Sequence, residues 1–197
     1  MAPLPYTSSG ANPIFGVLVG AFVLLEVFTR LRTRKNGRGA PEEWRSFVAV
    51  IGSIYLGFAA AFLAASELES LAIGFARWPV FVLGAVLTAT GIALRQWAIA
   101  VLGESFTVEV RVKPGQAVVE DGPYRWVAHP FYTGMIFVFV GIGLMLGNWI
   151  SLACMAVIPM LGLIFRIRTE EGVLIAGIGE SYRRFLATRA RLLPGVW

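Results

Sequence analysis

The stretch over residues 121–134, DGPYRWVAHPFYTG, is here called the motif segment and is the first candidate for chemistry. It holds the only histidine of the chain, His129, together with two tyrosines and two prolines, and it leads directly into an apolar run over 135–146. A polar, turn-rich sequence joined to a membrane-length helix predicts a site at the boundary between lipid and water. The alternative is a plain inter-helix loop in which Pro130 starts a helix, where a missing N–H costs nothing.

A second group of charged side chains follows the last apolar run, in the sequence RIRTEE. Arg166 and Glu170 are four residues apart, so they lie on one face of a helix. The helix leaves the membrane here, so one side chain can meet a lipid-borne molecule and the other a water-borne one. A guanidinium can hold an anionic group by two parallel hydrogen bonds, and a carboxylate can hold a cation or accept a proton. The alternative is a set of surface ion pairs, Arg166 with Glu170 and Arg168 with Glu171, which contribute little to stability.

Composition indicates what kind of protein positions these residues. Of the 197 residues, 57% are hydrophobic and 15% are charged, and the mean hydropathy is +0.72. A soluble domain of this length is seldom so apolar, so we expect an integral membrane protein whose partner is the lipid bilayer. The net charge of +5 does not indicate nucleic acid, because the basic residues lie between apolar runs. Cys154 is the only cysteine, which excludes a disulfide framework and a cysteine metal site, and we expect no metal.

Five apolar segments predict an all-α integral membrane protein with about five transmembrane helices. They cover residues 13–28, 47–65, 79–102, 131–146 and 149–165. A span needs about 20 residues, or about 17 at the shortest, so the first, fourth and fifth segments are marginal. Only two residues separate the last two segments, which predicts a tight helical hairpin. Gly16 with Gly20 and Gly143 with Gly147 have the spacing that lets helices approach closely, and they predict a homo-oligomer through glycine-rich helix faces.

The distribution of charge predicts the orientation. Basic residues are dense in the first connection and after the last span, and the third connection holds Arg111, Lys113 and Arg125. The second connection carries mainly Glu67 and Glu69. This alternation predicts an amino terminus outside, with the third connection and the carboxyl terminus on the cytoplasmic face, where a soluble cofactor would be available. The Ala-, Gly- and Arg-rich composition is typical of a high-GC bacterium, so we expect a bacterial inner membrane.

Three ordered pieces of the second half resemble the isoprenylcysteine carboxyl methyltransferase family. They are LRQWA at 94–98 with LGESFT at 102–107, GPYR at 122–125 with HPFYTG at 129–134, and RIRTEE at 166–171 with GESY at 179–182. Members of that family are integral membrane enzymes that use S-adenosyl-L-methionine. The resemblance implies transfer of a methyl group from this cofactor to a lipophilic acceptor, nominally the carboxylate of a prenylated carboxy-terminal cysteine.

The resemblance also implies how the chain is divided. Residues 1–78 would supply the first two transmembrane helices, and residues 79–197 would form the catalytic region with the other three. The catalytic region would contain a cytoplasmic cofactor-binding loop over 103–130 and a helical tail over 166–197. In the tail, residues 179–185 predict a helix break followed by an amphipathic basic helix on the membrane surface.

Individual site residues are carried over by position from the family. The expected cofactor-binding residues are Glu109, Gln116, Ala117, Val118, Val119, Tyr124, His129, Pro130, Phe131, Tyr132 and Glu170. Arg166 matches the family's substrate-side arginine, so Arg166 and Glu170 are the expected catalytic residues, with Arg166 binding the substrate. The family usually has arginine before the His-Pro pair, where this chain has Ala128, and the sequence leaves open whether Arg125 compensates.

The chemistry needs alignment more than acid catalysis. A carboxylate acceptor is already ionised near pH 7, and Arg166 can hold it. Glu170 can hold the cofactor's ammonium group or orient Arg166, and His129 can donate to the cofactor's carboxylate or cap a helix. Three aromatic residues are available for cation–π attraction to a sulfonium: Tyr124, Trp126 and Tyr132. A lipophilic acceptor would enter sideways from the bilayer.

Other functions stay open at this point. The acceptor is alternatively a phenolic lipid, a thiol or a phospholipid amine, and a phenol would need Glu170 or His129 as a base because its pKa is near 10. A lipid reductase using NADPH has a similar architecture, but the extra phosphate of NADPH calls for more basic residues than this loop holds. A membrane scaffold without catalysis is the third class. Binding of S-adenosyl-L-methionine, of NADPH or of neither separates them.

Overall fold

The computed structural model describes residues 2–33, 41–74, 76–106, 112 and 116–195. The helices are α1 (Leu4–Thr7), α2 (Ala11–Thr33), α3 (Pro41–Glu67), α4 (Arg77–Leu102), α5 (Pro130–Leu146), α6 (Trp149–Ile178) and α7 (Glu180–Thr188), with short 3₁₀ turns η2 (Glu69–Leu71), η3 (Gly103–Ser105) and η4 (Gly122–Arg125). The five expected segments coincide with α2 to α6. The all-α fold class is therefore confirmed, and the described residues form only isolated β-bridges.

Four of the helices, α2, α3, α4 and α6, are long and apolar enough to cross a membrane. The fourth expected span, α5, has only 17 residues. At about 1.5 Å per residue it covers about 25 Å, against about 30 Å for a hydrocarbon core. Large apolar side chains such as Leu24 and Tyr55 point outward, as they do where lipid takes the place of water. The chain is an integral membrane protein, and α5 as a full fifth span stays a prediction.

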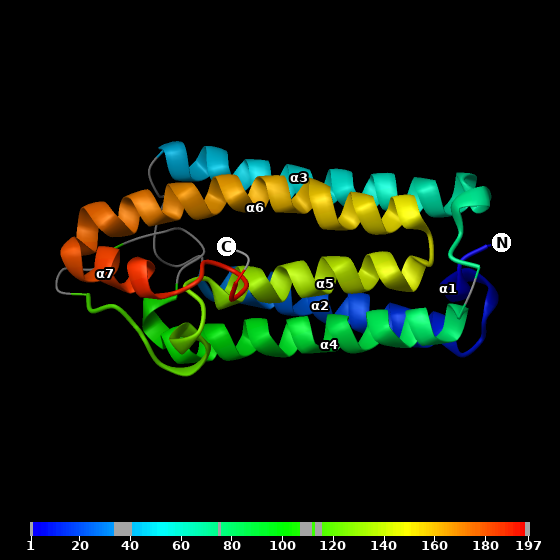
Figure 1. Ribbon diagram of the computed structural model, residues 1–197, viewed down its shortest axis with the longest axis horizontal. Helices are drawn as coiled ribbons and strands as arrows, with labels where there is room; N and C mark the ends of the chain where they lie inside the picture. Colours follow the sequence, from blue (N-terminus) through cyan, green and yellow to red (C-terminus); the bar gives the residue numbers. More distant parts are fainter. Residues whose placement is uncertain (1, 34–40, 75, 107–111, 113–115, 196–197) are drawn as a thin grey trace.

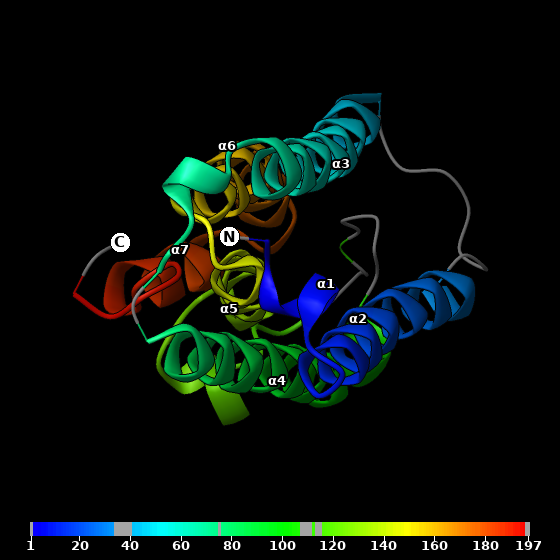
Figure 2. The same ribbon diagram turned by 90° about the vertical axis from the view of Figure 1, so that its right-hand side faces the viewer.

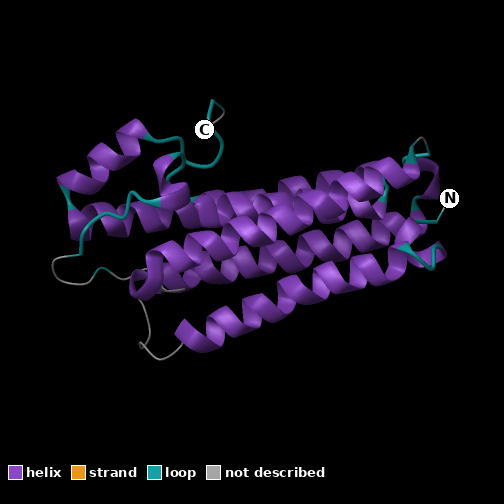
Figure 3. Ribbon diagram, turned by 90° about the horizontal axis from the view of Figure 1, so that it is seen from below, coloured by secondary structure: helices purple, strands orange, loops and turns teal. Residues whose placement is uncertain are grey.

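The long helices run side by side, with α5 inside the bundle. Figure 2 shows α5 between the α3–α6 pair on one side and α4 and α2 on the other. The long helices extend along most of the molecule, and the loops lie at its two ends (Figure 3). The start of α5, the end of α4, the far end of α6 and the whole of α7 gather at one end, opposite α1 (Figure 1). The segments named in the resemblance therefore meet at a single end of the bundle.

The turn between α5 and α6 confirms the expected hairpin. Gly147 has φ +63°, a conformation that glycine adopts without steric cost, and it ends α5. The side chain of Asn148 then caps α6, because its Oδ1 accepts hydrogen bonds from the backbone N–H groups of Ile150 at 2.9 Å and Ser151 at 3.2 Å. Its amide nitrogen donates to the carbonyl of Leu68 at 2.8 Å, which ties the hairpin to the end of α3.

Glycines close the interface between α4 and α5. A Cβ added to Gly91 would lie 2.5 Å from the Gly134 carbonyl oxygen, and one added to Gly84 would lie 2.5 Å from that of Gly141. These pairs, which the sequence analysis did not single out, let the two backbones touch. This contact surface between α4 and α5 is called the glycine seam below.

The two glycine pairs that were singled out behave differently. A Cβ on Gly143 would meet the backbone of Leu152 at 2.8 Å, and Gly147 forms the hairpin turn. The expectation that this pair forms an oligomer face was therefore wrong, because the α5–α6 hairpin uses both residues. A Cβ added to Gly16 or Gly20 would meet no atom of the described residues within 4 Å. That these two glycines form an oligomer face therefore stays a prediction.

The tail differs from expectation in one respect. α6 continues to Ile178 and ends at Gly179, whose φ is +83°, so the predicted helix break is confirmed. The helix that follows, α7, does not present its apolar face outward. Tyr182 and Phe185 are buried against Ala98, Tyr124 and Ala128, a group called the motif cluster below. The amphipathic pattern that predicted a membrane-surface helix is used inside the protein instead.

Candidate active site

A cavity of about 570 Å³ lies where the motif segment meets α2, α3 and α6. All the expected site residues except Glu109 and Pro130 line it: Gln116, Ala117, Val118, Val119, Tyr124, His129, Phe131, Tyr132, Arg166 and Glu170. Glu109 lies outside the described residues. Pro130 is buried as the first residue of α5 and starts the helix rather than facing the cavity. Residues from four distant parts of the chain are thus gathered around one space.

The cavity has a polar part and an apolar part. The polar part lies beside the motif segment, α6 and α7. The apolar part runs between α2 and α3 and is lined by Val19, Phe22, Val23, Val27, Val50, Ile51, Ile54, Tyr55, Phe58 and Phe62. Val23, Val27 and Tyr55 are also exposed on the outside of the bundle. The apolar part therefore opens sideways, on a surface that faces lipid.

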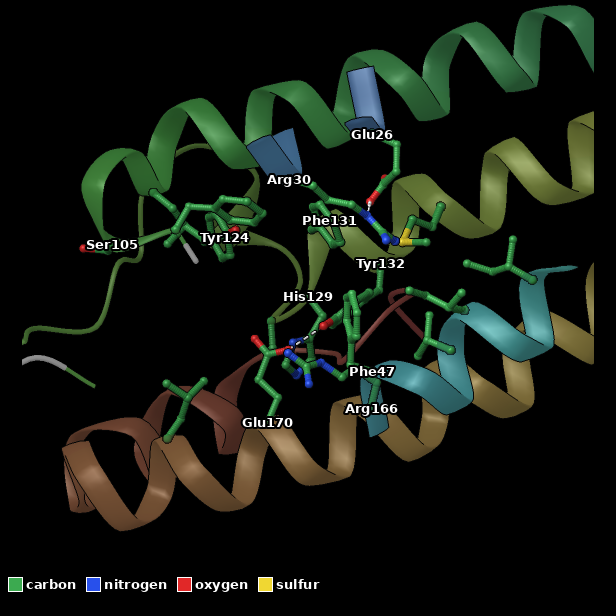
Figure 4. Close-up of a pocket in the computed structure, with 18 of the residues that line it drawn as sticks. Glu26, Arg30, Phe47, Ser105, Tyr124, His129, Phe131, Tyr132, Arg166 and Glu170 are labelled. Atoms are coloured by element: carbon green, nitrogen blue, oxygen red, sulfur yellow. Dashed lines mark hydrogen bonds and ion pairs between the residues drawn. The ribbon is translucent and has the colours of Figure 1, made fainter. Parts of the chain in front are cut away.

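Arg166 and Glu170 both line the cavity, as their four-residue spacing predicted. The hydroxyl of Tyr132 donates a hydrogen bond of 2.6 Å to Oε2 of Glu170. Nη1 of Arg166 donates to the hydroxyl of Ser46 on α3 at 2.9 Å, and the arginine is buried. Figure 4 shows Tyr132, Arg166 and Glu170 together on one side of the cavity. Arg166 is buried and Glu170 is half-buried, and each has a hydrogen-bond partner on another helix, unlike the surface ion pairs of the alternative interpretation.

His129 is held by the carboxylate of Glu171, which the surface ion-pair interpretation had paired with Arg168. Its Nε2 lies 3.1 Å from Oε1 of Glu171, and both side chains are buried. Nε of Arg191 donates to the same carboxylate at 2.9 and 3.2 Å. The spacing predicted that Glu171 pairs with Arg168, but Glu171 instead joins His129 to the carboxyl-terminal segment. His129 is the residue before α5, yet its side chain makes no capping bond.

The segment over residues 189–192, here called the strap, pairs with the motif segment through its backbone. The N–H of Ala128 donates to the carbonyl of Ala190 at 2.7 Å, and the N–H of His129 donates to that of Arg191 at 2.9 Å. The hydroxyl of Thr133 donates to the carbonyl of Leu192 at 2.8 Å. The first two bonds satisfy N–H groups just before α5, which have no partner within the helix. The strap therefore holds the motif segment in place from outside.

Two tyrosines in the polar part are kept neutral. Burial raises the pKa of the Tyr124 hydroxyl well above its usual value, and the negative charge of Glu170 raises it further. The pKa of Tyr182 is raised for the same reasons, burial first and then Glu170 and Glu171. Both side chains remain protonated at neutral pH. They can offer ring faces and hydroxyl groups to a ligand, but neither can act as a phenolate base.

Two candidates in the motif segment do not line the cavity. Arg125 does not take the place of the arginine that the family usually has at Ala128. Its side chain is 66% exposed and lies 3.5 Å from a carboxylate oxygen of Asp121, away from the cavity. Trp126 is also exposed and contacts Trp97, with ring centroids 5.9 Å apart. Only Tyr124 and Tyr132 of the three aromatic candidates line the cavity.

The structure adds site residues that the sequence analysis missed. Around the polar part these are Leu102, Ser105, Phe106, Ala128, Leu174, Ile178, Tyr182 and Phe185. On α2, Glu26 and Arg30 also line the cavity, although no site residue was expected in the first two helices. One signal was available in the sequence. A carboxylate such as Glu26 within an apolar span is costly unless it is paired, and such residues commonly serve function.

Residues 82–176 match the model of the Isoprenylcysteine carboxyl methyltransferase family. The protein-S-isoprenylcysteine O-methyltransferase of Schizosaccharomyces pombe is 27% identical over 192 residues, which cover 87% of this chain and 81% of that protein. The protein-S-isoprenylcysteine O-methyltransferase A of Arabidopsis thaliana is 31% identical over 122 residues, which cover 61% of this chain and 62% of that protein.

A solved structure has a similar fold. It is the structure of a eukaryotic intramembrane Ras methyltransferase, and it matches with a TM-score of 0.65 at 18% identity, covering 98% of this chain and 70% of that chain. The matched family region includes the glycine seam, the motif segment and both cavity-lining charges of α6. Residues 82–176 of this integral membrane protein are thus similar to the isoprenylcysteine carboxyl methyltransferase family, and the whole chain shares the fold of a solved member.

Proposed function

We propose that this protein transfers a methyl group from S-adenosyl-L-methionine to the carboxylate of a prenylated carboxy-terminal cysteine. One observation carries the proposal: a single cavity joins a polar part beside the motif segment to an apolar part that opens between α2 and α3. A water-borne donor and a lipid-borne acceptor can then meet in one space. The relatives named as isoprenylcysteine methyltransferases support the same acceptor class.

The residues of the polar part suit the proposed donor. A volume of about 570 Å³ for the whole cavity lies within the usual range of ligand sites, about 300–1,000 Å³. S-Adenosyl-L-methionine, when bound, supplies a methyl group on a positively charged sulfur, which leaves as a neutral thioether when the acceptor oxygen takes the methyl carbon. The rings of Tyr124 and Tyr132 attract such a cation through their negative faces. Glu170 supplies a carboxylate for the ammonium group, and the Tyr132 hydroxyl orients it.

Arg166 is the proposed acceptor-binding residue. The acceptor carboxylate is already ionised near neutral pH, so no base is needed and no proton is transferred. A guanidinium can bind both carboxylate oxygens and hold one of them in line with the methyl carbon. The hydrogen bond to Ser46 holds Arg166 at the wall between the polar and apolar parts. A phenolic acceptor would instead need a base, and Glu170 already accepts the Tyr132 hydroxyl proton in a hydrogen bond.

The location and assembly of the protein are also proposals. We infer that the end carrying α7 faces the cytoplasm of a bacterium, in its inner membrane, because the basic connections gather at that end. A homo-oligomer would use the α2 face that carries Gly16 and Gly20. Cysteine labelling tests the orientation. A cysteine that replaces Ser70 should react with a label added outside the cell, and one that replaces Ser181 should react only with a label that reaches the cytoplasm. The reverse pattern would leave the cavity outside the cell and contradict the proposal.

The function is tested by an activity assay with purified protein in lipid nanodiscs. Release of S-adenosylhomocysteine is measured with an S-farnesylated cysteine that has a free carboxylate, and with the matching carboxamide as a control. The carboxylate should be methylated and the carboxamide should not. Turnover of a panel of phenolic lipids, thiols or phospholipid amines in place of the carboxylate would redirect the acceptor assignment. Binding of NADPH instead of S-adenosyl-L-methionine would overturn the reaction class.

A further inference from the structure

Two charged residues meet inside the bundle, each on a helix long and apolar enough to cross a membrane. Arg95 on α4 is 1% exposed, and its Nη2 donates to the carboxylate of Glu26 on α2. The other carboxylate oxygen of Glu26 accepts from Nε of Arg30 at 3.1 Å. Charged residues within transmembrane helices are rare and usually serve a function. The pair also joins α2, which lies outside the matched family region, to α4, which lies within it.

The guanidinium of Arg95 faces an aromatic ring of the cavity wall. Its central carbon lies 4.4 Å from the ring centroid of Phe131 and 5.8 Å from that of Phe22. Nε of Arg95 is buried and has no hydrogen-bond partner among the described residues, so the ring faces provide its remaining attraction. The glycine seam permits this contact, because Gly91 and Gly134 let the two backbones touch beside Arg95.

Phe131 stands where the two parts of the cavity join. It packs against the motif cluster on one side and against the hydrophobic core of the bundle on the other. Its ring also contacts Tyr132 and Phe106, with centroids 5.2 and 5.4 Å apart. Figure 4 shows Phe131 between Glu26 and Arg30 on one side and the group of Tyr132, Arg166 and Glu170 on the other. A small shift of this ring would change how the donor and the acceptor face each other.

We propose that Glu26 is a positioning residue for methyl transfer, which acts by holding the Arg95 guanidinium over the Phe131 ring. Resting on the proposed function, this makes α2 a part of the active site rather than a membrane anchor. Glu26 neutralises the buried charge of Arg95 and sets the direction of its planar head. Without the Glu26 carboxylate, the Arg95 guanidinium turns toward other hydrogen-bond acceptors. It then no longer lies over the Phe131 ring. Donor binding rests mainly on Tyr124, Tyr132 and Glu170, whereas the alignment of donor and acceptor depends on the position of the Phe131 ring between them.

The experiment compares Glu26→Gln with the wild type in nanodiscs. We expect kcat to fall about tenfold or more, while the Kd for S-adenosyl-L-methionine stays within about threefold. Arg95→Lys should behave similarly, because a lysine keeps the ion pair with Glu26 but not the planar head over the ring. The control is Thr29→Val, which removes a buried hydroxyl from the same helix, outside the cavity. It should change the melting temperature without changing kcat.

A double-mutant cycle separates positioning from simple helix packing. In a Phe131→Leu background, Glu26→Gln should change kcat by less than about twofold, because the ring through which it acts is gone. Equal losses in both backgrounds would overturn the proposal. So would an unchanged kcat in Glu26→Gln.

A second readout needs no acceptor. With 4-fluorophenylalanine at position 131, the fluorine resonance should shift or broaden in Glu26→Gln and stay in place in Thr29→Val. If the wild type methylates no prenylcysteine, the proposed function fails, and the resonance alone decides the positioning role. An unchanged resonance then overturns that role, and a shifted one supports it for whichever acceptor the cavity takes.

Discussion

The two flanks of α5 are packed in opposite ways. Toward α4, the glycine seam brings backbones so close that an added Cβ would lie 2.5–2.6 Å from a carbonyl oxygen at Gly84, Gly91, Gly134 and Gly141. Toward α2 and α3 the apolar part of the cavity remains, and glycines of those helices such as Gly20 and Gly52 have no described atom within 4 Å of an added Cβ. The same residue type thus marks the tightest and the loosest parts of the bundle.

This difference in packing indicates that the two flanks of α5 have different roles. Because the backbones of α4 and α5 touch along the glycine seam, the two helices have little freedom to move relative to each other. The start of α5 and the motif segment are therefore held in a fixed position relative to α4. An opening lined by exposed apolar residues lets a lipid chain replace other lipid without a conformational cost. The proposed transfer of a methyl group to a lipid-borne acceptor needs both properties, because one reactant must be aligned and the other must diffuse in from the bilayer.

Breaking the seam should have the largest effect. Gly134→Ala places a Cβ 2.6 Å from the Gly91 carbonyl oxygen, so α4 and α5 must move apart. We expect a loss of about 1–3 kcal/mol of stability, with activity lost alongside, because overpacking shifts the backbone. Thermal melting in detergent measures it. Gly52→Ala on α3, where the added methyl meets nothing, is the control and should keep its melting temperature. Equal melting temperatures for both variants would refute the rigid seam.

The next largest effect is expected at Arg166, on the wall between the polar and apolar parts of the cavity. Arg166→Lys keeps the charge but not the planar two-pronged contact, so turnover should fall about 10–100-fold. Ser46→Ala removes only the anchor of the guanidinium and should cost less. The control is Arg168→Lys, an exposed arginine two residues further along α6. If Arg166→Lys turns over as fast as Arg168→Lys, Arg166 does not hold the acceptor.

A smaller effect is expected where the strap holds the motif segment. His129→Ala should weaken binding of S-adenosyl-L-methionine several-fold, because the ring lines the polar part and its partner Glu171 loses a hydrogen bond. Arg191→Gln should weaken it less, since the backbone bonds of the strap remain. Isothermal titration gives both affinities, with melting curves to show that the variants stay folded. Unchanged affinity in His129→Ala would make His129 a packing residue only.

The smallest effect is expected at the open flank. Val23→Trp narrows the apolar part between α2 and α3, so KM for the prenylated acceptor should rise a few-fold. The Kd for the donor should not change, because Val23 lines the apolar part of the cavity and not the polar part. Leu24→Trp is the matched control, since Leu24 is the next residue, is 71% exposed and does not line the cavity. A rise in KM for both variants would indicate a general effect on α2 and not a narrowed entry.

Hydropathy and local spacing determined the membrane class, the positions of the helices, the α5–α6 hairpin and the break at Gly179. They also put Arg166 and Glu170 on one helix face. Each of these depends on residues within a few positions of one another, because a helix repeats every 3.6 residues and a span is set by a continuous apolar run. The expected site residues could be named only because three short, ordered motifs resemble those of the isoprenylcysteine carboxyl methyltransferase family.

Only the tertiary structure decided which partners those residues have. Glu171 is one helical turn from Arg168, yet it bonds to His129 and Arg191, which lie 42 and 20 positions away. Glu26 and Arg95 are 69 positions apart. Local spacing says which side chains can meet within a helix, but not which helix face lies opposite. That depends on where backbones can approach, and the glycines between α4 and α5 show this for one residue, because Gly134 brings the start of α5 against Arg95.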